Sequence, residues 1–121
     1  MQNHCVIIAG PTITSDEELF HELNKHVTTV KCLENSLIET LLATHKVDIL
    51  LFEITTDSAV DMNIIKIIRN KFPDIEIILI DGVGNRSVLA QAFALGARDA
   101  FPLSYNRALL LERIQALLRQ I

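Results

Sequence analysis

Short apolar runs alternate with amphipathic stripes along the chain. The runs are rich in β-branched and aromatic residues and indicate five strands, at residues 5–9, 28–33, 48–54, 75–80 and, more weakly, 99–103. Between and after them, apolar residues recur at the i, i+3 and i+4 spacing of a helix face, which indicates five helices. The helical stripes are Leu19, Phe20, Leu23 and Val27; Leu37, Ile38, Leu41 and Leu42; Ile64, Ile65 and Ile68; Val88, Leu89, Ala92 and Phe93; and Leu110, Ile114, Leu117 and Ile121. This strict alternation predicts an α/β fold.

Polar residues that can cap a helix stand close to the start of each stripe. Their side chains accept hydrogen bonds from the free N–H groups of a first helical turn. The candidate caps are Thr14 with Glu17 or Ser15 with Glu18, Ser36 with Glu39, Asp61, Ser87 and Asn106. They place the helix starts to within a few residues.

The composition of the runs predicts where each strand lies in the sheet. Strands joined by helices pair in parallel and are covered on both faces, and the continuously apolar residues 49–52 and 77–80 fit central positions. Residues 28–33 alternate with polar residues, and the last run contains Pro102, which cannot donate a ladder hydrogen bond, so both fit edges. With right-handed crossovers this predicts a doubly wound, five-stranded parallel sheet of order 2-1-3-4-5, a flavodoxin-like three-layer sandwich. A functional site is expected at the carboxyl ends of the strands.

Composition narrows the classes of protein that fit this pattern. The chain has 121 residues, 50% of them apolar, which fits a single folded domain over residues 1–121 and excludes disorder of the whole chain. Its net charge of -4 leaves no basic face for direct binding of nucleic acid. No apolar run is long enough for a membrane span or a signal-peptide core, so we expect a cytoplasmic protein. Cys5 and Cys32 form neither a zinc motif nor a disulfide framework.

Two carboxylates stand where neighbouring strands of the predicted sheet end. Glu53 ends the third strand and Asp81 follows the fourth, so we expect both in one cleft, a few ångströms apart. Together with Asp57 in the following loop, they could bind a divalent cation. In the alternative interpretation, they share a proton or lie under an arginine such as Arg86. No serine or cysteine has a histidine within motif reach, so no nucleophilic hydrolase is predicted.

Two loops invite a nucleotide-binding interpretation. Residues 12–15 follow the first strand and are rich in hydroxyl groups, and residues 82–86 follow the fourth strand and contain two glycines. Acidic side chains next to both loops, at residues 16–18 and at Asp81, would repel a phosphate. We therefore expect no bound cofactor.

Three segments carry a resemblance to a known family. They are residues 47–54 (VDILLFEI), 95–99 (LGARD) and 110–118 (LLERIQALL). Through them the chain resembles, from end to end, the receiver domain of two-component response regulators. In that family an aspartate at the end of the third strand accepts a phosphoryl group, and an acidic pair after the first strand holds magnesium. The fourth strand ends in threonine or serine, and the fifth carries a lysine.

The resemblance assigns each of these roles to a residue of a different kind. It places the acidic pair on Gly10 and Pro11, or on Ala9 and Gly10 with a shift of one residue. The phosphoacceptor falls on Glu53 and the hydroxyl on Asp81. On the fifth strand and just after it, the aromatic switch falls on Ala100, or on Phe101 with a slip of one residue, the lysine on Leu103 and the following proline on Ser104. Phosphoryl transfer to a carboxylate needs cations that neutralise the phosphoryl oxygens. We therefore expect a degenerate receiver, or pseudo-receiver, that binds no metal and is not an enzyme. Glu53 could also mimic a phosphorylated aspartate, although Asp81 and Leu103 could not respond to it.

The last helix offers a candidate interface. In receivers the face built by the fourth helix, the fifth strand and the fifth helix commonly makes the dimer or output contact. The candidate interface residues are Arg98, Arg107, Leu109, Leu111, Arg113 and Leu118. The leucines extend the apolar stripe of the helix, which indicates either such an interface or wider burial against the sheet. The three arginines, together with Arg119, could form a polar rim.

The sequence leaves three functions open. The first is a phosphorylation-independent signalling module that dimerises, binds proteins and regulates an attached output domain or a separate partner. The second is a receiver that is still phosphorylated, through a rebuilt metal site at Glu53 and Asp81. The third is a flavodoxin-like domain that senses a small ligand in its polar cleft.

Overall fold

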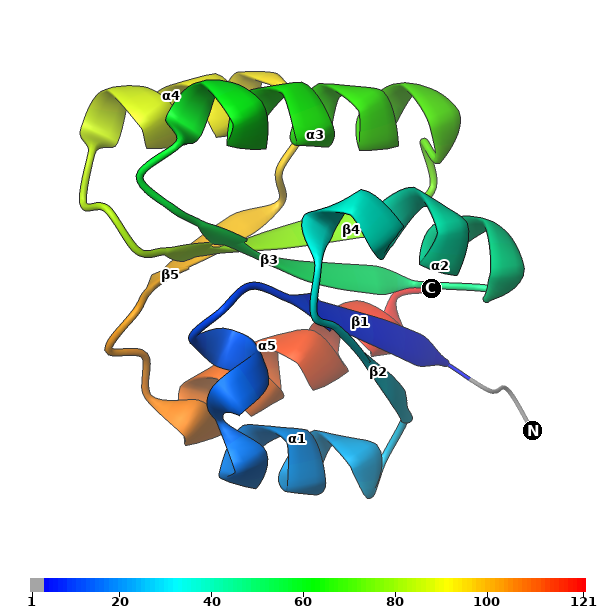
Figure 1. Cartoon of the computed structure of the whole chain (residues 1–121). Helices are drawn as coiled ribbons and strands as arrows, with labels where there is room; N and C mark the ends of the chain where they lie inside the picture. The colour runs from blue at the N-terminus through cyan, green and yellow to red at the C-terminus, as the bar shows by residue number, and fades with distance from the viewer. Residues whose placement is uncertain (1–3) are drawn as a thin grey trace.

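Five parallel strands form a sheet of order β2-β1-β3-β4-β5 in the computed structural model, which describes residues 4–121 (Figure 1). The strands are β1 (Cys5–Ala9), β2 (Thr28–Cys32), β3 (Ile49–Ile54), β4 (Glu76–Asp81) and β5 (Asp99–Pro102). Each agrees with its predicted run to within one residue at either end. The predicted order and parallel pairing are confirmed.

Helices cover both faces of this sheet. They are η1 (Ile13–Ser15), α1 (Glu17–Asn24), η2 (Asn35–Leu37), α2 (Ile38–Thr44), α3 (Ser58–Lys71), α4 (Arg86–Ala94) and α5 (Arg107–Arg119), of which η1 and η2 are short 3-10 helices. Helices α2, α3 and α4 lie on one face, and α1 and α5 lie on the other (Figure 1). The predicted three-layer sandwich is therefore confirmed. None of the helices within residues 4–121 is long and apolar enough to cross a membrane.

The sheet separates two hydrophobic cores, and the central strands contribute to both. In β3, Leu50 and Phe52 pack in the core under α2, α3 and α4, whereas Ile49 and Leu51 pack in the core under α1 and α5. Successive side chains of a strand point to opposite faces, so a strand covered on both faces has apolar residues at successive positions. This explains the continuous apolar runs of β3 and β4.

The strands at the two edges are less buried, as predicted. In β2, Thr28 is exposed while Thr29 and Cys32 are buried, and β5 is half-buried along most of its length. Pro102 ends β5 and pairs only with Asp81 of β4. A proline is tolerated there because its missing N–H leaves no ladder partner unsatisfied at an outer edge.

The start of α1 differs from the prediction. Residues 13–15 form η1, so the helix cap falls on Asp16 instead of Thr14 or Ser15. The hydroxyl groups of Thr14 and Ser15 instead donate to the carbonyl oxygens of Gly10 and Pro11, at 2.6 and 3.0 Å. They therefore hold η1 against the end of β1 and do not cap α1.

Three of the remaining predicted caps are also wrong. Helices α3 and α4 begin earlier than expected, and Asp57 and Asn85 cap them in place of Asp61 and Ser87. Helix α2 follows η2, and its N-cap residue makes no side-chain cap bond, so the box of Ser36 and Glu39 is absent. Only the predicted cap of α5, Asn106, is confirmed, with its side chain accepting from the Leu109 N–H.

Candidate functional site

Glu53 lies at the switch point of the sheet, where the connections after the paired strands β1 and β3 lead to helices on opposite faces. It is the penultimate residue of β3 and is only 4% exposed. Its Oε1 atom accepts hydrogen bonds from the backbone N–H groups of Thr12 and Ile13, both at 2.8 Å. We call this arrangement the η1 clasp. Because its acceptor is a carboxylate in a buried position, the clasp is stronger than hydrogen bonds between neutral groups.

The clasp depends on the residue before Pro11. Gly10 has a φ of 138°, and a Cβ atom built on it would lie 2.2 Å from the Glu53 Cβ and 2.7 Å from Oε1. Glu53 therefore fills the space that a side chain at residue 10 would need. Gly10 and Pro11, to which the resemblance assigns the magnesium pair, have no side-chain oxygen, so these residues do not fit a metal site of that type.

Asp81 lies on the neighbouring strand but binds a different loop. It is the last residue of β4, and its Oδ1 accepts from the N–H groups of Val83 and Gly84, at 3.0 and 2.8 Å. The expected pair of carboxylates is thus divided: Glu53 binds the β1–α1 loop, and Asp81 braces the turn before α4. No donor serves both side chains among the hydrogen bonds of residues 4–121.

The carboxylates at these strand ends do not gather into a cation site. Asp57 caps α3 by accepting from the Val60 N–H at 3.4 Å, and Arg86 is exposed at the first position of α4. Within residues 4–121, no three or more His, Cys, Asp or Glu side chains are arranged to hold a metal ion. The rebuilt site of Glu53, Asp57 and Asp81 is therefore not formed.

Asp61 is a second buried carboxylate that the sequence analysis mistook for a helix cap. It is 1% exposed, and its Oδ2 accepts from the backbone N–H and the hydroxyl of Thr55, at 2.7 and 3.1 Å. Burial raises the pKa of Asp61, and the charges of Asp57 and Glu53 raise it further. The available signal was its spacing: residue 61 precedes Ile65 and Ile68 on the apolar stripe of α3.

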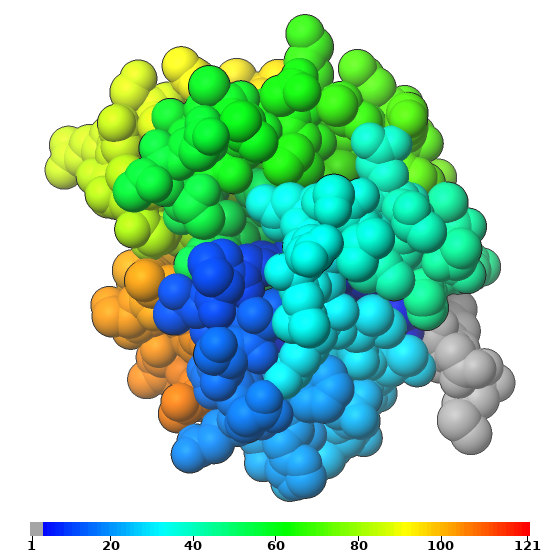
Figure 2. All heavy atoms as spheres, viewed as in Figure 1, coloured from blue at the N-terminus to red at the C-terminus, as the bar shows by residue number. Residues whose placement is uncertain are grey.

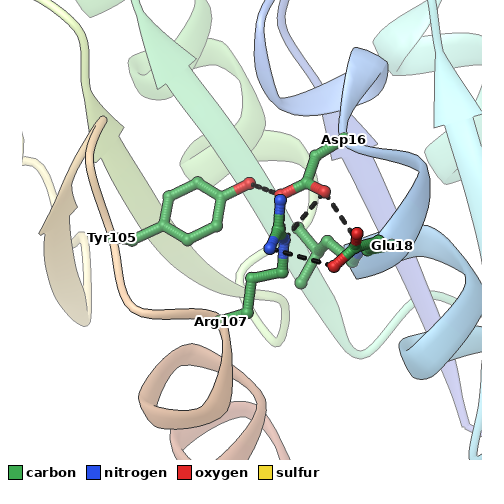
Figure 3. A network of polar contacts seen from close by, with 5 residues as sticks. Asp16, Glu18, Tyr105 and Arg107 are labelled. Atoms are coloured by element: carbon green, nitrogen blue, oxygen red, sulfur yellow. Dashed lines mark hydrogen bonds and ion pairs between the residues drawn. The ribbon is translucent and has the colours of Figure 1, made fainter.

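A cluster of four side chains joins the start of α1 to the start of α5 (Figure 3). Tyr105 donates its hydroxyl to Asp16 Oδ2 at 2.5 Å, and the Arg107 Nε atom lies 2.9 Å from both Asp16 carboxylate oxygens. The Arg107 Nη1 atom also pairs with Glu18 at 3.1 Å. We call this cluster the α1–α5 lock. Sequence analysis missed it because Asp16 and Tyr105 are far apart in the chain.

The lock changes the proton affinities of its members. Burial by itself favours a neutral Asp16, but hydrogen bonds from Tyr105, Arg107 and the Leu19 N–H outweigh it and lower the pKa of that carboxyl. Burial and the neighbouring Asp16 carboxylate raise the pKa of the Tyr105 phenol well above its ordinary value. At neutral pH the lock therefore joins an ionised Asp16 to a protonated Tyr105.

A hollow of about 610 Å³ lies beside the lock, at the same end of the sheet. It is lined by Thr12, Ser15, Asp16, Glu17, Glu18, Leu103, Ser104, Tyr105 and Arg107. Figure 2 shows the segment after β1 (blue) on this surface, between the β5–α5 connection (orange) and the β2–α2 connection (cyan). Two charged side chains of the hollow, Asp16 and Arg107, already form an ion pair with each other.

The positions to which the resemblance assigns a lysine and an aromatic switch carry apolar side chains. Leu103 lies just beyond β5, is partly exposed and lines the hollow, and its N–H donates to the Asp81 carbonyl at 3.2 Å. Ala100 packs against the core under α2, α3 and α4, whereas Phe101 packs against the core under α1 and α5. Neither position offers a cation.

The candidate interface residues of α5 divide into exposed and buried members. Leu109 is 58% exposed, whereas Leu118 is 6% exposed and belongs to the core, which fits the alternative of wider burial against the sheet for Leu118. Leu111 is partly buried against the same core. The reason is that the stripe of α5 is wide enough to contact the sheet on both sides of Ile114.

Three of the four predicted rim arginines already have partners within the described residues. Arg113 pairs with Asp99 at 2.8 Å, and Arg98 donates to Gln120 at 3.3 Å. Arg107 belongs to the α1–α5 lock. Beside Arg113, a smaller hollow of about 360 Å³ is lined by Phe101, Leu109, Glu112, Arg113 and Ala116.

No family model and no curated protein matches the chain. Several solved structures have the same architecture. A response regulator from Thermotoga maritima is 17% identical, with a TM-score of 0.83 over 98% of this chain and 99% of that chain. A CheY-like receiver domain protein from Methanospirillum hungatei is 13% identical, with a TM-score of 0.87 over 98% and 96%. The response regulator DrrB of Thermotoga maritima is 14% identical, with a TM-score of 0.81, but the match covers only 54% of that longer chain. The chain therefore has the fold of a response-regulator receiver domain.

Proposed function

We propose that this chain is a pseudo-receiver, a signalling module that works through protein contacts and dimerisation without being phosphorylated and without an activity of its own. It regulates an attached output domain or a separate partner. The observation that carries this proposal is the η1 clasp, in which the residue at the phosphoacceptor position is bound by its own β1–α1 loop.

The clasp argues against phosphorylation of Glu53 on chemical grounds. A carboxylate that attacks a phosphoryl donor needs a free oxygen, an open approach and cations to balance the developing charge. Oε1 of Glu53 is engaged by two N–H donors, and burial of the side chain restricts the approach to Oε2, which accepts no hydrogen bond from the described residues. Gly10, Pro11 and Leu103 provide neither a metal ligand nor an ammonium group where the family has them.

The exposed part of α5 supports the protein-interaction half of the proposal. Leu109 is exposed beside the hollow that Phe101 and Ala116 help to line, and Phe93 of α4 is also exposed. Exposed apolar side chains rimmed by charged groups such as Glu112 and Arg113 are typical of protein-binding surfaces. The longer chain of DrrB supports an attached output domain as one regulated partner.

Mass spectrometry after incubation with acetyl phosphate and Mg²⁺ tests the proposal. We expect no mass gain of one phosphate, either in the natural chain or in Glu53→Asp, because the second variant restores the acceptor but not the cations. Omission of Mg²⁺ and the variant Glu53→Gln are the controls. A magnesium-dependent gain in the natural chain that Glu53→Gln abolishes would show that the domain is a phosphorylated receiver.

A further inference from the structure

We infer that the η1 clasp and the α1–α5 lock form one conformational relay, so that releasing Glu53 from the β1–α1 loop also loosens the start of α5. The relay would give this fold a means of regulating α5 that involves neither a phosphoryl group nor a metal. The inference deepens the proposed function, because it describes how Glu53 communicates with the α5 surface proposed for partner binding. It rests on the proposed function only in taking that surface as the one that partners bind.

The clasp and the lock lie at the two ends of one short segment. Thr12 and Ile13 begin this segment and bind Glu53, and Asp16 ends it and belongs to the lock. Between them, Thr14 donates both its N–H and its hydroxyl to the Gly10 carbonyl, at 3.2 and 2.6 Å.

Further backbone bonds close the segment on itself. The Asp16 N–H donates to the Ile13 carbonyl at 3.2 Å, and the Ser15 N–H donates to the Thr12 carbonyl at 3.0 Å. Because these backbone hydrogen bonds hold residues 12–16 together, the segment between the clasp and the lock moves as one unit. A shift at Thr12 and Ile13 is therefore transmitted to Asp16.

Asp16 couples this segment to α5 because one carboxylate serves several donors. It caps α1 through the Leu19 N–H at 3.1 Å and also accepts from Tyr105 and Arg107. Its side chain is only 12% exposed, so little water is available to replace a lost partner. If Asp16 moves, Tyr105 and Arg107 lose this shared carboxylate acceptor at the same time. Both residues lie at the start of α5.

The relay has a closed and a released state, and the closed state is the major one. Release leaves the Glu53 carboxylate in a buried position without its two N–H donors, which is unfavourable. A partner that binds α5 better in its released position shifts the equilibrium toward that state in proportion to its differential affinity. By reciprocity, any change that breaks the clasp strengthens the binding of such a partner.

The composition of the chain provides a specific probe. Tyr105 is the only tyrosine. Labelling with tyrosine that carries ¹³C at the Cζ position therefore gives a single NMR signal, which reports the hydrogen bond of this phenol. The signal of Asp16→Asn defines the position expected for a broken lock, and the signal of the natural chain defines the closed position.

The decisive variant is Glu53→Asp, which retains the charge but withdraws the carboxylate from Thr12 and Ile13 by one methylene. We expect the Tyr105 signal to move at least half of the way to the Asp16→Asn position. Glu76→Gln, which alters a partly buried glutamate at the amino end of β4, is the matched control and leaves the signal unchanged.

Comparison with Glu53→Gln separates the relay from a simple electrostatic effect. The charge of Glu53 itself contributes to the raised pKa of Tyr105, after burial and Asp16. A purely electrostatic link predicts a shift in Glu53→Gln and none in Glu53→Asp. The relay predicts a shift in Glu53→Asp and a smaller shift in Glu53→Gln, whose amide oxygen can still accept from the Thr12 and Ile13 N–H groups. A shift confined to Glu53→Gln overturns the inference.

The reverse direction keeps the test decisive if the Glu53 variants do not fold. Tyr105→Phe removes only the hydroxyl that binds Asp16. We expect the amide protons of Thr12 and Ile13 to exchange at least several-fold faster in this variant, with no change in Arg113→Gln, which breaks an ion pair of α5 outside the lock. Unchanged exchange at both amides overturns the relay, and neither NMR result depends on whether acetyl phosphate modifies the chain.

Discussion

Glu53 can lie where it does only because residue 10 has no side chain. The carboxylate reaches the N–H groups of Thr12 and Ile13 through the space beside Gly10, whose φ of 138° is also unfavourable for any residue with a Cβ atom. The glutamate and the glycine are thus one structural feature, made of residues from two neighbouring strand ends. Asp61 is the other unusual residue of this region, because its charge is buried close to that of Glu53.

Substitution of Gly10 tests the packing of Glu53. Gly10→Ala places a methyl group 2.2 Å from the Glu53 Cβ and adds backbone strain, so we expect it to lower the free energy of unfolding by about 2 to 4 kcal/mol. Gly84→Ala is the matched control, because Gly84 also has a positive φ of 74° but has nothing within 4 Å of a new Cβ. It should cost about 1 kcal/mol in the same urea titration. Equal losses for both variants would show that Glu53 does not restrict residue 10.

The raised pKa of Asp61 predicts how the stability of the fold depends on pH. Because the folded pKa lies above the unfolded one, Asp61 contributes most favourably when protonated, and this contribution is lost as the pH rises through the folded pKa. Asp61→Asn removes the titration, so the variant should gain stability relative to the natural chain as the pH increases from about 4. Urea unfolding at a series of pH values measures this difference. The exposed Asp74→Asn is the control, and a stability difference for Asp61→Asn that does not vary with pH would contradict the prediction.

Among the elements, the short helix α1 depends strongly on contacts outside itself. It contains eight residues, and an isolated helix of that length is not stable in water. Its stability comes from Leu19 and Leu23 in the core and from Asp16, which caps it and joins it to α5. Helix α4 is capped in the same way by Asn85, but without a comparable cluster.

The two capped helices therefore provide a matched comparison. Asp16→Ala removes the cap, worth about 1 kcal/mol, and leaves the Tyr105 hydroxyl without an acceptor, which costs about 1 to 3 kcal/mol more. Asn85→Ala removes only a cap and should cost about 1 kcal/mol. Urea unfolding of both variants measures the difference. If the two losses are equal, the α1–α5 lock contributes nothing to stability.

At the scale of the whole molecule, the carboxyl end of the sheet and the surface of α5 are adjacent regions. The clasp and the lock occupy the first, and exposed Leu109, with its neighbouring hollow, belongs to the second. The edge strand β5 contributes Phe101 to this hollow and ends in Pro102, which discourages the addition of another strand there. Association through side chains of α5 is therefore the form of dimerisation that this edge favours.

Self-association through α5 is tested by reversing the character of one exposed leucine. We expect Leu109→Glu to weaken dimerisation at least tenfold in sedimentation equilibrium, because it places a charge in an apolar contact. Leu33→Glu is the matched control, since Leu33 is 77% exposed beside the opposite edge strand. A natural chain that stays monomeric at all concentrations, or a dimer insensitive to Leu109→Glu, would contradict a dimer interface on α5.

The parts of the structure that could be predicted are those with a local or periodic cause. Continuous apolar runs identified β3 and β4 as central, and Pro102 identified β5 as an edge strand. The helix caps were predicted poorly, because Ser, Thr and Asp near a helix start have several local uses. Thr14 and Ser15 bond backward to β1, and Asp61 turns into the core.

The amino-acid sequence by itself determined the α/β class, the strand order and the position of Glu53 at the end of the third strand, because each depends on the pattern or identity of nearby residues. Only the tertiary structure decided what Glu53 binds, that Asp81 serves another loop, and that Asp16 joins Tyr105 and Arg107. These contacts join positions that are distant in the chain. Their partners are set by the register of strands and the positions of loops, which depend on the packing of the whole sheet.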